Sequence, residues 1–260
     1  LETLSSLDSI DFILLQEVDT FSTRSYQDNQ YEAIGRQLDS HAGFFVRNYD
    51  VAFVPMPVFN PMGRVVSGLC IFSSCPVAQT EMLVFPGSFP WPKRLFMPDR
   101  CFLASRIPLP EGKGLVVINT HNSAFDDGRL RNAQLQMLKD YMEECLERGD
   151  HVVAGGDWNL NPPGYDNGQF ASGEPAFSIS VPAGKEDFIS SGRFAFQPAF
   201  PTNRDVSAPY VPGQTPATII DFFVCSPGIR IVGVKTLYNH FDYSDHHPVY
   251  MRFELTGNGH

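Results

Sequence analysis

The first apolar run of the chain, DFILLQE at residues 11–17, is continuous rather than alternating and ends in polar residues. A run of this kind is typical of a strand that is buried on both faces. The run HVVAG at residues 151–155 has the same character and is followed closely by Asp157. We therefore expect two buried strands whose carboxyl ends carry Glu17 and Asp157.

Further strands are predicted along most of the chain. They cover residues 43–54, 65–73, 101–107, 115–120, 218–225, 229–237 and 248–255. In the last of these segments, Val249, Met251 and Phe253 alternate with the polar residues Arg252 and Glu254, which predicts a strand with one solvated face.

Helical spacing of apolar residues appears twice. Residues 129–148 have the clearer pattern, and Gly149 follows as a stop signal. A second helix is expected over about residues 25–41. Segments 85–99 and 160–216 are rich in Pro, Gly and Ser and predict irregular surface loops. Mixed strands and helices favour a layered α/β sandwich over a purely parallel wound sheet.

Composition narrows the class of protein. Hydrophobic residues make up 43% of the 260 residues, which is enough for a sizeable core, and the formal net charge is −10. An acidic chain repels polyphosphate overall, so a general nucleic-acid coat protein is excluded, whereas an enzyme with a local cationic cleft is not. Five cysteines without a CxxC pair indicate buried thiols rather than a disulfide framework.

The compartment stays open on sequence grounds. No stretch approaches the roughly 18 apolar residues of a membrane span, and no signal peptide is recognisable. The sequence begins at Leu1 rather than Met, which is compatible with an upstream targeting segment or anchor.

Five short polar motifs stand where apolar strands end. They are Gln16-Glu17, Asn119-Thr120-His121, Gly156-Asp157-Trp158-Asn159, Ile220-Asp221-Phe222 and Ser244-Asp245-His246-His247-Pro248. Each one alone is ordinary, since a Glu after a strand usually marks the protein surface and a lone His is usually structural. Together they place carboxylates, imidazoles and amides at strand ends, where sites in α/β proteins assemble.

The residue types suit attack on a phosphoester. Carboxylates such as Glu17 and Asp245 fit a hard cation such as Mg²⁺, and Asp157 fits the orientation of a water molecule. A histidine held by an aspartate can donate to a phosphate oxygen. Zinc is disfavoured because His246 and His247 are adjacent and no His-x-x-x-His occurs. A Gly-x-Ser-x-Gly elbow and a Walker loop are both absent from the sequence.

In this order and over nearly the whole chain, the motifs resemble the endonuclease/exonuclease/phosphatase superfamily, the deoxyribonuclease I-like proteins. The resemblance implies a four-layered α/β/β/α sandwich of two packed mixed sheets, formed as a single domain over residues 1–260. It also implies a metal-dependent phosphoester hydrolase that uses Mg²⁺ or Mn²⁺.

The resemblance assigns a role to each motif residue. Glu17 is the expected principal metal ligand, with Asp245 at or near the same cation. Asp157 and Asn159 are expected to orient the attacking water and the phosphate. His246, oriented by Asp221, would bind a phosphate oxygen, and the resemblance leaves open whether Asp157 or His246 is the general base. His121 would assist the leaving group or hold the phosphate.

The chain departs from the family pattern in two places that matter. The family opens with a strand that ends in a metal-holding Asn, and this sequence begins after that point, so we expect the sandwich to lack its first strand. The segment SGLCIFS at residues 67–73 lacks the Gly-Asn of many relatives. Asn122 and Trp158 replace Leu and Phe, and we expect both changes to be tolerated.

Three residues are secondary candidates for substrate binding. Arg24 has the bidentate fork that suits a phosphate, although a solvated charge or a helix cap explains it equally well. Arg94, with Lys93, Arg100, Trp91 and Phe96 around it, would give the 85–99 loop a basic aromatic edge for a nucleic-acid strand or a lipid headgroup, unless the loop packs on itself. Tyr243 would line the cleft.

Two functions of different classes follow. The first is hydrolysis of a phosphoester, most directly a phosphodiester, in a nucleic acid, a phospholipid headgroup or a small molecule. The second is a non-catalytic binding module that retains the fold, which the missing first-strand Asn keeps open. Neither requires a protein partner, and we expect a monomer.

Overall fold

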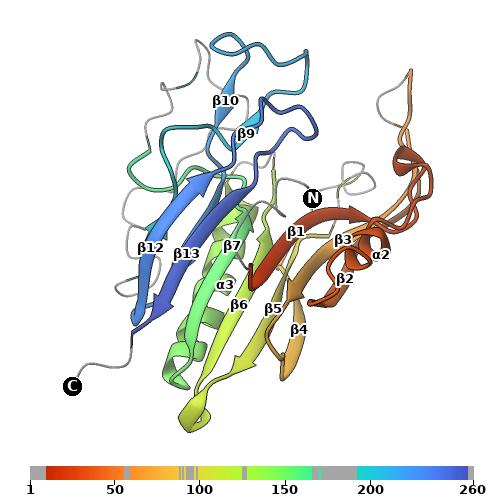
Figure 1. The fold of residues 1–260 in the computed structure, drawn as a ribbon. Helices are drawn as coiled ribbons and strands as arrows, with labels where there is room; N and C mark the ends of the chain where they lie inside the picture. The colour runs from red at the N-terminus through yellow and green to blue at the C-terminus, as the bar shows by residue number, and fades with distance from the viewer. Residues whose placement is uncertain are drawn as a thin grey trace.

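The computed structural model describes residues 10–55, 59–87, 99–124, 128–165 and 192–256, together with residues 89, 91, 97 and 170. Its elements pack as a four-layered α/β/β/α sandwich, as predicted (Figure 1). In chain order the elements are β1 (Phe12–Asp19), η1 (Thr23–Ser25), α2 (Gln30–Gly35), β2 (Ala42–Val54), β3 (Gly63–Ser73), β4 (Gln79–Val84), β5 (Cys101–Pro108), η3 (Pro110–Gly112), β6 (Gly114–His121), α3 (Arg129–Glu147), β7 (His151–Asp157), β8 (Arg193–Ala195), β9 (Asn203–Arg204), β10 (Ala217–Thr218), β11 (Asp221–Cys225), β12 (Ile229–Thr236) and β13 (Val249–Leu255).

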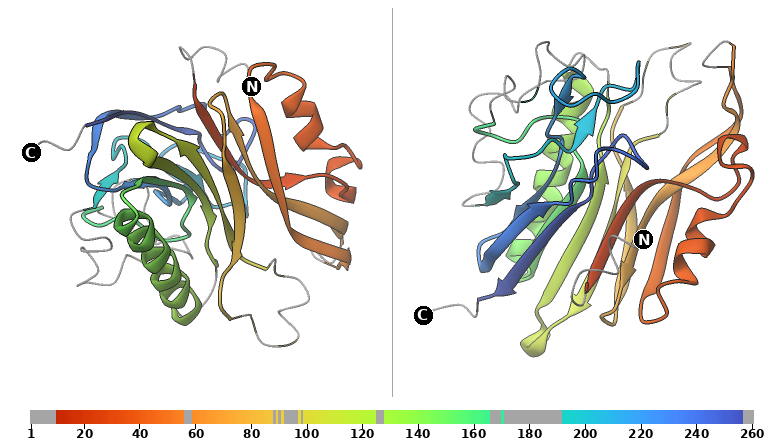
Figure 2. Two further views of the ribbon diagram at one scale, coloured as in Figure 1. Left: turned by 90° about the horizontal axis from the view of Figure 1, so that it is seen from below. Right: turned by 45° about the horizontal axis from the view of Figure 1, so that its top comes forward.

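The larger inner layer is a mixed six-stranded sheet in the order β4-β5-β6-β7-β11-β8. Its only parallel pair among the described strands is β6–β7, which α3 connects as a crossover helix. The second inner layer holds the antiparallel sheet β1-β3-β2 and the separate pair β12–β13. Figure 2 shows α3 outside the six-stranded sheet and α2 outside the sheet that contains β1.

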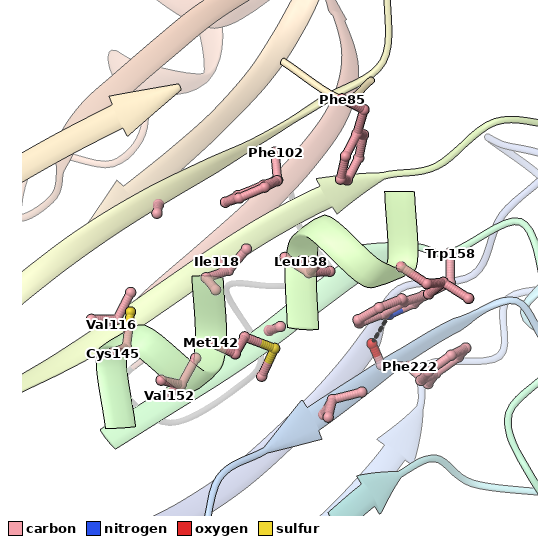
Figure 3. Close-up of a cluster of buried hydrophobic side chains, with 14 of the residues drawn as sticks. Phe85, Phe102, Val116, Ile118, Leu138, Met142, Cys145, Val152, Trp158 and Phe222 are labelled. Atoms are coloured by element: carbon pink, nitrogen blue, oxygen red, sulfur yellow. Dashed lines mark hydrogen bonds between the residues drawn. The ribbon is translucent and has the colours of Figure 1, made fainter. Parts of the chain in front are cut away.

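Alternation along the strands explains the layers. In β6, Val116 and Ile118 face α3, where they meet Leu138 and Met142 (Figure 3). The intervening Val117 faces the second inner layer. The six-stranded sheet is therefore apolar on both faces, as the continuous runs predicted.

The other layers are joined by smaller apolar clusters. Leu69 and Ile71 of β3 pack against Cys101 and Leu103 of β5, which joins the two inner layers. On the far side of β1 and β3, Tyr31 and other residues of the α2 region cover the sheet. The five cysteines are all free thiols, and four of them are buried, as expected.

The predicted helix over residues 25–41 is wrong in extent. Only η1 and the six-residue α2 form there, because Tyr26 and Gln27 adopt positive φ angles of 57° and 64° that break any longer helix. Asn29 instead caps α2 by accepting a hydrogen bond from the backbone N–H of Glu32. The helix predicted over residues 129–148 is confirmed as α3.

Two strand predictions need smaller corrections. The predicted strand 218–225 is interrupted at Ile219 and Ile220, so that β10 and β11 belong to different sheets. Strand β4 was not predicted, because its sequence QTEMLV has no clear apolar period. Two irregular loops were predicted, over residues 85–99 and 160–216, and most of residues 88–98 and residues 166–169 and 171–191 lie outside the described ranges. The short strands β8 and β9 form within the second predicted loop and were not expected. Within the part of the chain that is described, no helix is long and apolar enough to cross a bilayer.

Candidate active site

Three neighbouring strands of the six-stranded sheet bring polar side chains to one edge. His121 at the end of β6 is the parallel register partner of Asp157 at the end of β7. Asp221, the first residue of β11, lies opposite Asp157 in the antiparallel β7–β11 pair. Adjacent strands therefore place His121, Asp157 and Asp221 side by side, as the strand-end motifs predicted.

A glycine makes this edge possible. Gly156 has a φ of 138°, and a Cβ atom built on it would lie 2.1 Å from the backbone oxygen of Thr120. No other residue type fits so close to the backbone of β6. The glycine of the GGDWN motif thus lets β7 approach β6 where His121 and Asp157 meet.

Asp157 is held as a buried, ionised carboxylate. Its Oδ1 accepts the backbone N–H of Asn159 at 2.9 Å, its Oδ2 accepts the Asn159 side-chain amide at 3.1 Å, and His121 Nε2 lies 3.3 Å from Oδ2. Burial opposes the charge, but these hydrogen bonds and the nearby His121 and His246 together lower the pKa of Asp157 to about 2. Asp157 is therefore an acceptor near neutral pH.

Asn159 is itself fixed from three sides. Its backbone has a positive φ of 50°. Its side-chain amide also donates to the backbone oxygen of Asn122 at 2.9 Å, and Arg131 Nη1 donates to the backbone oxygen of Asn159 at 2.7 Å. A strained backbone that neighbours hold in place is typical of functional sites. Asp157 and Asn159 thus form a hydrogen-bonded pair just after the end of β7.

His246 and Asp221 form the second polar pair of the site. His246 Nδ1 lies 2.8 Å from Asp221 Oδ2, and because a carboxylate accepts, this ring nitrogen donates. Thr202 Oγ1 accepts the backbone N–H of Asp221 at 3.0 Å, and the side-chain amide of Asn203 lies 2.9 Å from His246 Nε2. Both ring nitrogens of His246 are thus positioned by neighbours.

The electrostatics of this pair favour a cationic histidine. Burial lowers the pKa of His246, but Asp221, Asp157 and Asp245 outweigh it and raise this pKa to about 10. Burial also raises the pKa of Asp221, and the charge of His246 opposes that shift. We favour the imidazolium, because three carboxylates act on the ring. An imidazolium donates from both ring nitrogens, so in this form the Asn203 amide presents its oxygen rather than its nitrogen to Nε2.

Glu17 comes to the site from the other inner sheet. The β1–β3 register shifts between Leu15 and Val18, and Glu17 has a φ of 52° at this bulge. Bulges re-aim side chains. The side chain of Glu17 is 55% exposed, and its Oε2 lies 3.4 Å from Arg24 Nη1. Although the side chain is exposed, the protein atoms around it displace part of its water and act to raise the pKa of Glu17. The charges of His121, Arg24 and Arg100 outweigh this effect and lower the pKa, so the carboxylate is ionised near neutral pH.

The buried side chain of Asn119 links the two inner sheets beside Glu17 through hydrogen bonds. The side chain of Asn119 on β6 donates to the backbone oxygens of Leu15 on β1 and Cys70 on β3, both at 2.9 Å. Its oxygen accepts a 2.5 Å hydrogen bond from Gln16. Because Gln16 and Asn119 belong to the first two strand-end motifs, these motifs also hold the layers together, a role that the sequence does not reveal.

The residues present fit a hard divalent cation. Glu17 is ionised, and Asp245 is exposed in the loop before His246. Within the described ranges, no three His, Cys, Asp or Glu side chains are grouped closely enough to form a metal site of their own. Mg²⁺ needs only one or two carboxylates, since water and substrate phosphate supply its other ligands. The donor set therefore suits such an ion.

The neighbouring histidine has a different task. His247 is buried, its Nδ1 donates to the backbone oxygen of Pro201 at 2.7 Å, and its Nε2 accepts the backbone N–H of Phe241 at 3.2 Å. His246 and His247 therefore point to different partners. His247 fixes the loop that presents Asp245 and His246.

The secondary candidates occupy different places. Arg24 donates to both carboxylate oxygens of Asp19 at 2.9 Å, besides its contact with Glu17. Tyr243 is 89% exposed. Arg94, Lys93 and Phe96 lie outside the described residues.

Arg100 does not lie at a loop edge. It is only 8% exposed, and its Nη1 contacts His121 Nε2 in the interior of the site. The sequence placed Arg100 on the basic aromatic edge of the 85–99 loop rather than beside His121, and it gave Asn203 and Thr202 no role. For Arg100 the sequence offers one signal, its position. It directly precedes the predicted strand at residues 101–107, and the next predicted strand along the chain, residues 115–120, is followed by His121.

Solved structures share this fold. An endonuclease/exonuclease/phosphatase from Beutenbergia cavernae is 20% identical, with a TM-score of 0.63 over 95% of this chain and 63% of that one. The human Nocturnin catalytic domain, solved with bound sulfate, is 17% identical, with a TM-score of 0.60 over 95% of this chain and 81% of that one. Danio rerio TDP2, solved with a single-strand DNA product, is 16% identical, with a TM-score of 0.58 over 94% and 86%.

These likenesses show the fold, and the chain spans 63% of the length of the Beutenbergia protein. A search of curated proteins found no match. A family model, however, matches residues 2–246 and is that of the Endonuclease/Exonuclease/phosphatase family. The order of the five motifs and this match agree, and the chain belongs to the endonuclease/exonuclease/phosphatase family.

Proposed function

We propose that this chain is a divalent-metal-dependent hydrolase of phosphoester bonds, with phosphodiesters as its main substrates. The observation that carries the proposal is the polar edge at which Asp157, an ionised acceptor, lies beside His121 and the Asp221–His246 pair. Acceptors for a water molecule and donors for a phosphate oxygen thus stand together, as attack of water on phosphorus requires.

Each residue has a task in that reaction. Asp157 and Asn159 accept from and orient the attacking water, and the imidazolium of His246 donates to a non-bridging phosphate oxygen. The water oxygen forms a bond to phosphorus, and the bond from phosphorus to the leaving oxygen breaks. Asp157 accepts the proton that the water loses and passes it to solvent. The leaving oxygen gains a proton from His121, which takes one back from solvent, so that atoms and charge balance.

Glu17 and Asp245 would hold Mg²⁺ or Mn²⁺. When bound, the ion neutralises phosphate charge and polarises the phosphorus–oxygen bonds. The exposed, ionised carboxylate of Glu17 suits this role, because it is accessible to a hydrated cation and has only Arg24 as a close partner among the described residues.

Net charge and the structures that share this fold bear on the substrate class. Nocturnin was solved with sulfate and TDP2 with a single-strand DNA product, so phosphate-like anions and nucleic acid both have precedents on this fold. The net charge of −10 favours a small or lipid phosphodiester over a long polyanion. We further propose that the whole chain acts as one domain and without a protein partner.

One assay tests this function. The purified protein is incubated with Mg²⁺, Mn²⁺ or EDTA and bis(p-nitrophenyl) phosphate, plasmid DNA, sphingomyelin or inositol phosphates. We expect hydrolysis of at least one substrate that depends on metal and stops with EDTA. A folded protein that hydrolyses none of them would support the binding-module hypothesis instead.

A further inference from the structure

Arg100 is a charged side chain that the proposed reaction does not yet use. It directly precedes β5 and is buried, and its Nε atom has no hydrogen-bond partner among the residues that the structure describes. Its Nη1 contacts only the ring nitrogen of His121, and no described carboxylate lies within ion-pair distance. Buried guanidinium groups are normally paired, so this one is incompletely compensated.

The charge of Arg100 persists despite burial. Burial lowers the pKa of Arg100, and the carboxylates of Glu17 and Asp157 oppose this shift from a distance. A guanidinium remains protonated in proteins even when its pKa is lowered. The site therefore contains a permanent cation whose donors are only partly used.

The contact with His121 also limits what that histidine can do. An arginine N–H can only donate and a carboxylate can only accept, so His121 Nε2 can satisfy Arg100 or Asp157 but not both at once. An anion bound to Arg100 would accept from its guanidinium and leave His121 Nε2 to Asp157.

We propose that Arg100 binds a phosphoryl oxygen of the substrate at the base of the site, beside His121. The inference rests on the proposed function, because it names the group that recognises the phosphate. A guanidinium offers paired donors that match phosphate geometry. Arg24, the alternative, is a poorer candidate because Asp19 already takes two of its donors.

The test measures phosphate binding rather than activity alone. Inorganic phosphate is titrated into the full chain by calorimetry at one fixed Mg²⁺ concentration, for the wild type, Arg100→Met and Arg100→Lys. We expect phosphate affinity to fall at least about tenfold in Arg100→Met, the size of one charge-assisted hydrogen bond, and by less in Arg100→Lys. On bis(p-nitrophenyl) phosphate, KM should rise in the same order.

A matched control lies on the same strand. Arg106 of β5 pairs with Asp150 through bonds of 2.8 and 3.1 Å, far along the strand from His121. Arg106→Met should lower the melting temperature and leave phosphate affinity unchanged. An equal loss of phosphate affinity in this variant would overturn the assignment to Arg100.

The remaining outcomes separate the two proposals. Wild-type phosphate affinity in a folded Arg100→Met overturns the inference, and if this variant does not fold, Arg100→Lys decides in the same way. A wild type that does not bind phosphate also overturns it. A wild type that binds phosphate through Arg100 but hydrolyses no substrate refutes the proposed function and leaves the anion site standing.

Discussion

The two halves of the site are built in opposite ways. On the six-stranded sheet, Asp157 and Asn159 are buried and bonded to each other and to their neighbours before any substrate arrives. On the β1 side, Glu17 is 55% exposed, stands on a bulge and has Arg24 as its close partner. One half is complete within the protein, and the other half is open to solvent.

This difference indicates which half needs a ligand. A buried carboxylate must be satisfied by fixed donors, because removing it from water is costly, and Asp157 has such donors. An exposed carboxylate keeps its water and can exchange that water for a hydrated cation. The acceptor and donor groups of the proposed reaction are therefore preorganised, whereas the proposed metal ligand is accessible.

The largest predicted effects are on turnover, and they should occur in both halves. Asp157→Asn and Glu17→Gln should each lower turnover by about 10³-fold or more, because one removes the water acceptor and the other the metal ligand. Stability should separate them. Asp157→Asn should cost about 2 kcal/mol at neutral pH, from the shift of its pKa from 3.8 to about 2.

The contribution of Asp157 to the free energy of unfolding should also depend on pH. Because the pKa of Asp157 is lowered in the folded state, its stabilisation is present above pH 3.8 and is lost as pH falls toward about 2. Denaturant unfolding between these pH values should therefore be less pH-dependent in Asp157→Asn. Equal destabilisation in Glu17→Gln would contradict the contrast between the halves. Full turnover in either variant would contradict the proposed function.

A smaller effect is expected within the preorganised half. Asp221 makes the largest contribution to raising the pKa of His246, so Asp221→Asn should lower that pKa from about 10 toward the neutral range. If His246 acts as a cation, the alkaline fall in kcat/KM should then begin at lower pH, with a loss of about tenfold near pH 8. The pH profile on bis(p-nitrophenyl) phosphate measures this shift.

Stability should follow the same titration. The raised pKa of His246 stabilises the fold fully below pH 6.5, and this contribution is lost as pH rises toward about 10. Asp205→Asn is a matched control, because this half-buried carboxylate bonds to Ser207 and not to His246. A wild-type pH profile in Asp221→Asn, or the same shift in Asp205→Asn, would argue against a cationic His246.

The sequence predicted the preorganised half better than the open one. Continuous apolar runs located β1, β6 and β7, because strands buried on both faces need such runs, and the polar residues that follow them could be read directly. The register of β6, β7 and β11 then brought His121, Asp157 and Asp221 together. The polar residues at these strand ends therefore explain why the three side chains lie together, and the order of the motifs was sufficient for the family.

The open half depends on backbone details that patterns do not encode. The left-handed φ of Glu17 follows from a bulge against β3, a partner distant in sequence. The positive φ angles of Tyr26 and Gln27 likewise ended the predicted helix. Burial of Arg100 depends on its contact with His121, 21 residues further on, which only the tertiary structure reveals.

The smallest predicted effect concerns a residue that supports the preorganised half without touching its chemistry. The Trp158 indole N–H donates to the backbone oxygen of Phe222 at 2.9 Å, and the two rings stack with centroids 4.9 Å apart (Figure 3). Trp158→Phe keeps an aromatic ring but leaves that buried oxygen without its donor, which should cost about 1–3 kcal/mol. The melting temperature should fall by roughly 2–8 °C, while kcat and KM change less than about twofold. A large loss of kcat at unchanged melting temperature would show that Trp158 positions Asp157 or Asn159 directly, and the contrast between structural support and chemistry would then fail at this residue.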